Sequence, residues 1–122
     1  MIDIFLAIAL LITGIGVHEV GHFVVARSYG YKARFTYTTG LSGVAPAVYI
    51  GQLSDRGAVP IFAAGPIAQA LFTFPVILMI GDPLIQVVFF MLAVMGWSMD
   101  VWMIWSYLRY GLKGLERWFD LK

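Results

Sequence analysis

Residues 4–26 read IFLAIALLITGIGVHEVGHFVVA, an apolar run that carries two histidines and a glutamate in its second half. A helix needs about 20 residues, each rising about 1.5 Å, to cross a hydrocarbon core about 30 Å thick. The run is longer than the roughly 7–15 apolar residues of a cleaved signal peptide, and no basic residue precedes it. It therefore predicts a retained transmembrane helix.

Two further apolar runs, over about 58–80 and 84–108, are also long enough to cross a membrane. The chain has 122 residues and is 61% hydrophobic and 12% charged, whereas soluble domains average about 45–50% apolar and about 25% charged residues. We expect one domain over residues 1–122. The net charge of +1 gives no reason to expect a nucleic-acid partner, and the lack of cysteine excludes cysteine-ligated metals.

The basic residues predict the orientation. In a three-span arrangement all of them fall at one end, namely Arg27, Lys32, Arg34, Arg56, Arg109, Lys113, Arg117 and Lys122. Lysine and arginine gather on the cytoplasmic side of membrane proteins. The sequence therefore predicts an outside N-terminus and a cytoplasmic C-terminus.

The remaining segments predict smaller elements at the interface. Residues 34–38 and 47–50 are rich in β-branched and aromatic side chains, which indicates a short β-hairpin between the first two spans. The tail, 111–122, has apolar residues at helical spacing with charges between them, which is typical of an interfacial helix. The expected fold is an all-α membrane protein with three transmembrane helices, this hairpin and a C-terminal interfacial helix.

The two histidines of the chain lie in the motif His18-Glu19-Val20-Gly21-His22. Residues four apart share one face of a helix, so both imidazoles can reach one metal ion. Glu19 is close enough to water at the metal to act as the catalytic general base. Ionisable groups inside lipid are costly, which favours a functional site; the alternative is a set of hydrogen bonds between helices.

A catalytic zinc site needs three protein ligands and one open position. Among the remaining acidic residues only Asp100 lies within a span. Asp100 precedes Arg109 by the same nine residues that separate His18 from Arg27, so both lie about 14 Å from the inner flank. We therefore predict one zinc ion per chain, held by His18, His22 and Asp100. The alternative for Asp100 is a protonated carboxyl bonded to a neighbouring helix.

The middle span contains a proline, Pro66, next to Gly65 at the expected depth of the metal. Proline leaves the carbonyl four residues earlier, that of Phe62, without its helical partner. Gln69, one turn further along, could donate to a substrate carbonyl or to a developing oxyanion, or bond between helices. Three glycines near the histidines are expected to let helices approach closely: Gly14, Gly16 and Gly21.

These motifs together resemble the site-2 protease family of intramembrane zinc metalloproteases. The stretch 18–27 is similar to the first motif of that family, Ala64-Gly65-Pro66 to its glycine-proline motif, and Asp100 to the aspartate of its last core helix. The resemblance covers nearly the whole chain and implies the ligands and base named above. Where the family usually has glycine after the aspartate, this chain has Val101, and Gln69 occupies the region of a usual asparagine.

The predicted function is zinc-dependent endopeptidase activity on membrane-spanning protein substrates, with the active site toward the cytoplasmic side of the bilayer. A substrate helix must unwind before attack, because its backbone groups are bonded internally. Strand pairing with the segment around Phe35 or Tyr49 could hold it extended. The alternative is a non-catalytic membrane protein that binds or transports a metal. The oligomeric state is left open.

Overall fold

The computed structural model describes residues 3–40 and 43–121. Within this part of the chain, three helical segments are long and apolar enough to cross a membrane. The first is α1 (Ile4–Ser28) and the second is α2 (Ala58–Met79). The third is divided into α3 (Pro83–Met95) and α4 (Ser98–Tyr110) by a turn at Gly96 and Trp97.

Two aspartates determine where helices begin at one end of the bundle. The Asp3 carboxylate accepts a hydrogen bond from the Leu6 backbone N–H at 2.8 Å, and Asp82 accepts one from the Leu84 N–H at 2.8 Å. Each satisfies a backbone donor that has no partner within its helix. Pro83 follows as the first residue of α3, where its missing N–H costs nothing.

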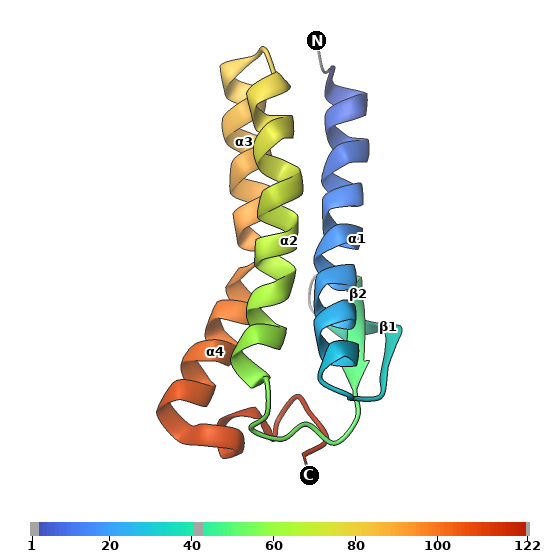
Figure 1. Ribbon diagram of the computed structural model, residues 1–122. Helices are drawn as coiled ribbons and strands as arrows, with labels where there is room; N and C mark the ends of the chain where they lie inside the picture. Colours follow the sequence, from blue (N-terminus) through green and yellow to red (C-terminus); the bar gives the residue numbers. More distant parts are fainter. Residues whose placement is uncertain (1–2, 41–42, 122) are drawn as a thin grey trace.

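The helices α1 and α2 lie side by side along most of their length, and α3 lies beside the C-terminal half of α2 (Figure 1). Glycine permits a close approach of α1 to α2, because a Cβ atom added at Gly21 would meet the Ala64 carbonyl oxygen at 2.6 Å. Gly14 also faces α2, because a Cβ atom added there would lie 3.6 Å from Gln69 Nε2. Among the residues that the structure describes, no other part of the chain comes within 4 Å of a Cβ atom added at Gly16, so the predicted role in helix packing is wrong for this glycine.

The predicted β-hairpin is confirmed, with longer strands. Strands β1 (Ala33–Gly40) and β2 (Gly43–Ile50) pair antiparallel, with Ala33 opposite Ile50. The hairpin lies beside the C-terminal half of α1 (Figure 1). The rings of Phe23 and Phe35 stack with centroids 4.5 Å apart, which fixes β1 against α1.

The tail differs from the prediction. Instead of an interfacial helix over 111–122, a short 3₁₀ helix, η1 (Gly111–Leu115), is followed by turns. Gly111 ends α4 with a φ of +67°, a conformation that favours glycine. The tail then folds beneath the bundle, where Leu115 is fully buried and the rings of Phe119 and Phe62 lie 5.3 Å apart. Its apolar residues complete the core instead of facing lipid.

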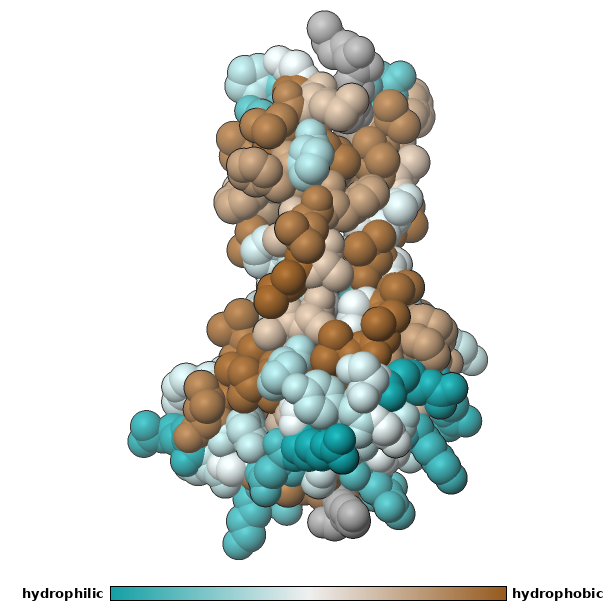
Figure 2. Space-filling model, in the orientation of Figure 1, coloured by the Kyte–Doolittle hydropathy of each residue, from teal (hydrophilic) through white to brown (hydrophobic). Residues whose placement is uncertain are grey.

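The surface separates into an apolar column and a polar base (Figure 2). Large apolar side chains such as Phe5, Leu71 and Leu84 are exposed along the helices. Hydrophilic side chains gather at the end of the molecule where the C-terminus lies. An exposed apolar surface of this extent is unusual for a soluble monomer, and it is the pattern expected of helices that face lipid.

Candidate metal centre

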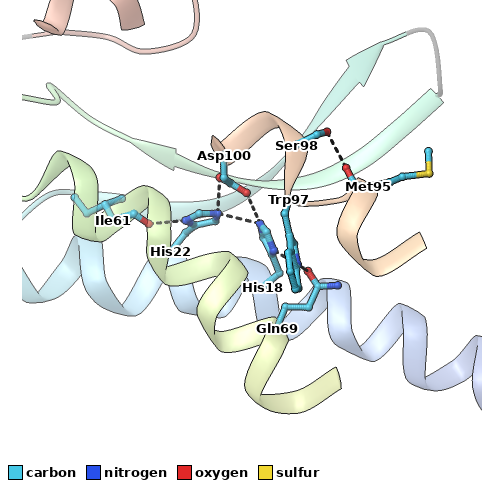
Figure 3. A network of polar contacts seen from close by, with 8 residues as sticks. All are labelled: His18, His22, Ile61, Gln69, Met95, Trp97, Ser98 and Asp100. Atoms are coloured by element: carbon cyan, nitrogen blue, oxygen red, sulfur yellow. Dashed lines mark hydrogen bonds and ion pairs between the residues drawn. The ribbon is translucent and has the colours of Figure 1, made fainter. Parts of the chain in front are cut away.

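The structure brings together the three residues that the sequence predicted as ligands. His18 and His22 lie one turn apart on α1, and Asp100 reaches them from the first turn of α4 (Figure 3). The Nε2 atoms of the two histidines are 3.1 Å apart. Asp100 Oδ2 lies 2.7 Å from His18 Nε2, and Oδ1 lies 3.0 Å from His22 Nε2. All three residues are buried, so these donor atoms face one another rather than water.

The other nitrogen of each imidazole has a partner on α2. His22 Nδ1 lies 2.7 Å from the carbonyl oxygen of Ile61, and His18 Nδ1 lies 2.8 Å from Gln69 Oε1. Both partners are oxygens that accept, so each Nδ1 carries the hydrogen and donates it. When the rings are neutral, each Nε2 therefore presents a lone pair to the carboxylate of Asp100. Outer partners of this kind fix the tautomer and the orientation of histidine ligands.

This donor set fits a divalent metal ion. Two lone pairs and a carboxylate within about 3 Å repel one another unless a cation, either a proton or a metal ion, neutralises them. Two imidazoles and one carboxylate are a ligand set that suits zinc. Tetrahedral zinc with bonds of about 2.0–2.1 Å places its ligand atoms about 3.3 Å apart. The observed separations of 2.7, 3.0 and 3.1 Å are shorter than this by about 0.2–0.6 Å, so the three side chains would move apart to admit the ion.

Gly65 of α2 leaves space beside the donor atoms. A Cβ atom at this position would lie 2.7 Å from His18 Nε2 and closer still to His22 Nε2. A methyl group here would therefore occupy the space in which both nitrogens converge. The glycine of the Gly65-Pro66 pair, which the sequence placed at the depth of the metal, is thus a requirement of the site's shape.

We expect Gly65→Ala to abolish stoichiometric zinc binding, because its methyl group takes the place of the ion or displaces a histidine. Gly16→Ala is the matched control: it adds the same methyl group to α1 in open space and should retain zinc. Metal analysis of both purified variants, with circular dichroism to monitor folding, makes the comparison. Full zinc content in folded Gly65→Ala would contradict this geometry.

The remaining predicted residues take different positions. Glu19 is half-buried, and within the described part of the chain no hydrogen bond or ion pair engages its carboxylate. Gln69 is buried, and its side-chain oxygen accepts a hydrogen bond from His18. Its predicted contact with substrate stays a prediction. Pro66 lies within α2, which continues through it. The carbonyl that bonds to the site is that of Ile61, next to Phe62 in the chain.

Trp97 belongs to the site but was missed in the sequence. Its indole Nε1 donates to Gln69 Oε1 at 2.8 Å. The available signal was an indole N–H inside an apolar span, three residues before Asp100, because a buried indole N–H needs an acceptor. The role of the Ile61 carbonyl was harder to predict. Its sequence signal was only that Ile61 precedes Phe62, whose carbonyl Pro66 leaves without a helical hydrogen bond.

Comparisons with protein-family models, with curated proteins and with solved structures give no match to this chain. The resemblance to site-2 proteases therefore rests on the three sequence motifs. The functional argument rests on the buried cluster and on the apolar helices that carry it.

Proposed function

We propose that this chain is a zinc-dependent endopeptidase that spans a membrane and cleaves membrane-spanning protein substrates. The observation that carries the proposal is the buried cluster of His18, His22 and Asp100. Glu19 follows His18 in α1, and within residues 3–40 and 43–121 its carboxylate has no hydrogen-bond or ion-pair partner. Isolated ionisable groups are expensive within apolar helices. A structural role would require only mutual hydrogen bonding, and it would leave Glu19 unexplained.

Each residue has a distinct part in the proposed reaction. His18, His22 and Asp100 hold the ion, and the carboxylate of Asp100 balances part of its charge. When bound, zinc supplies a Lewis acid that polarises the peptide carbonyl and lowers the pKa of water to about 7. Glu19 accepts a proton from the attacking water and delivers it to the leaving amine. The surrounding helices limit the access of other water.

The hairpin is suited to hold an unwound substrate. Phe35 of β1 stacks on Phe23, the residue that follows His22, so the strand lies beside the part of α1 that carries the cluster. Each strand of a two-stranded sheet has one unpaired edge. An extended peptide can add to such an edge through backbone hydrogen bonds, which would compensate for the helical bonds that a substrate loses.

We propose that the polar base, with the C-terminus, faces the cytoplasm. The chain has no cysteine, so single cysteines at Gly81, between α2 and α3, and at Lys113 in η1 give clean labels on exposed positions. In intact cells, a membrane-impermeant maleimide should label Gly81→Cys alone, and Lys113→Cys should react only after the cells are opened. Labelling of both positions in intact cells would refute the three-span topology.

The experiment that tests the function combines metal content with cleavage. Wild-type protein in lipid vesicles should contain stoichiometric zinc and should cut at least one member of a panel of single-span substrates. His22→Ala should lose both properties, because two remaining ligands cannot hold zinc tightly. Chelation of the wild-type protein should stop cleavage, and added zinc should restore it. Wild-type zinc content in His22→Ala would refute the ligand assignment.

A further inference from the structure

The side-chain oxygen of Gln69 receives two hydrogen bonds, one from helix α1 and one from the turn between α3 and α4. Trp97 Nε1 lies 2.8 Å from Gln69 Oε1, and His18 Nδ1 lies 2.8 Å from the same atom (Figure 3). An indole nitrogen can only donate, so the amide atom that faces Trp97 is the oxygen. We propose that Trp97 is a positioning residue, which acts through Gln69 to hold His18 in the tautomer that a metal requires.

The physical reason is the near symmetry of an amide. Rotation by half a turn exchanges its oxygen and nitrogen with almost no change in shape, so hydrogen bonds alone select the orientation. In the rotated form, the amide N–H would donate to His18 Nδ1, and the ring hydrogen would move to Nε2. A protonated Nε2 is no longer a metal ligand, and it would instead donate to Asp100 Oδ2, 2.7 Å away.

Burial of Gln69 makes the orientation of its amide depend strongly on the hydrogen bond from Trp97. Gln69 is 2% exposed, so water has little access to replace a lost donor, and an unmet hydrogen bond is costly there. Trp97 lies in the turn between α3 and α4, three residues before Asp100. The same turn therefore positions Asp100 directly and His18 through Gln69. The break in the third apolar segment thereby controls two of the three proposed ligands.

Trp97→Phe tests the inference, because it removes the indole N–H and retains most of the apolar ring. In metal-free protein, nitrogen NMR of the imidazoles should show that hydrogen shifts from Nδ1 to Nε2 of His18. Zinc affinity, measured by chelator competition, should fall about 10–100-fold, the usual cost of losing an outer partner of a metal ligand. Trp102→Phe is the control, because Trp102 is half exposed on α4 and stacks on Trp105; it should change neither reading.

A second substitution separates positioning from simple packing. In Q69E both terminal atoms of the side chain are oxygens, so its orientation no longer depends on Trp97. Trp97→Phe should therefore weaken zinc binding in the wild-type background and leave it unchanged in the Q69E background. An equal loss in both backgrounds, or an unchanged tautomer in Trp97→Phe, would overturn the inference.

The inference rests on the proposed function for its biological meaning, but the two can fail separately. The tautomer is read in metal-free protein and requires neither zinc nor proteolysis. A protein with the predicted tautomer shift that never cleaves a substrate would refute the proposed function alone. A zinc-dependent protease in which Trp97→Phe leaves the His18 tautomer unchanged would refute only the positioning role.

Discussion

Asp100→Asn is expected to give a folded protein that has lost most of its zinc affinity and most of its proteolytic activity. Both carboxylate oxygens of Asp100 face a histidine Nε2, at 2.7 and 3.0 Å. Asparagine has nearly the same shape, but it carries no charge, and one of its two terminal atoms donates instead of accepting. The variant therefore keeps the packing and removes the anion that balances the metal.

The affinity loss should exceed the roughly 10–100-fold that follows removal of an outer partner, because Asp100 is proposed to contact the ion itself. Asp120→Asn provides the control, since it is the same chemical change on an exposed residue beneath the bundle. Chelator competition and cleavage of one membrane substrate should be measured on both variants. Full zinc affinity and activity in Asp100→Asn would move the third ligand elsewhere.

The convergence of His18 and Asp100 was predictable because an α-helix has a constant rise per residue. Each residue lies nine positions before a basic residue that marks the same end of its span, and a fixed rise per residue turns equal counts into equal depths. The positions of the basic residues predicted the depth of the cluster in the membrane. The cost of an isolated carboxylate in an apolar segment predicted that Asp100 contacts the histidines. The structure confirms the contact.

The network around the cluster was not predictable in the same way, because depth does not specify rotation about the helix axis. Whether Gln69 faces a substrate or His18 depends on how α2 turns, and the position of Trp97 depends on the turn between α3 and α4. The sequence pattern also predicted close helix packing at both Gly16 and Gly21. Only the packing of α1 against α2 separates them.

The tail was mispredicted because one sequence pattern is compatible with two environments. Apolar residues at helical spacing suit a helix on a membrane surface, but they equally suit a segment that turns beneath a bundle. The glycines were the overlooked signal. Gly111 adopts a positive φ, and a Cβ atom at Gly114 would lie 2.5 Å from the Ser106 carbonyl oxygen, so the chain can reverse tightly against α4.

Glu19→Gln should produce a folded, zinc-loaded protein that does not cut its substrate. The amide is nearly isosteric with the carboxylate, so the half-buried position in α1 is preserved. Zinc should remain, because its proposed ligands are other side chains. The amide cannot accept a proton at neutral pH, and loss of a positioned general base typically slows a reaction about 10²–10⁴-fold.

The comparison should be made at matched zinc content, with cleavage of one membrane substrate by wild type, by Glu19→Gln and by Glu116→Gln. Glu116 is the other glutamate of the chain and lies exposed in the tail, so its variant reports any general effect of removing a negative charge. A membrane protein that only binds or carries zinc has no use for a proton acceptor beside its ligands, and Glu19→Gln would leave its metal handling intact. Equal cleavage rates in all three proteins would show that Glu19 is not the base. A selective loss in Glu19→Gln with zinc retained would separate catalysis from metal binding, because no ligand, fold or charge effect predicts that combination.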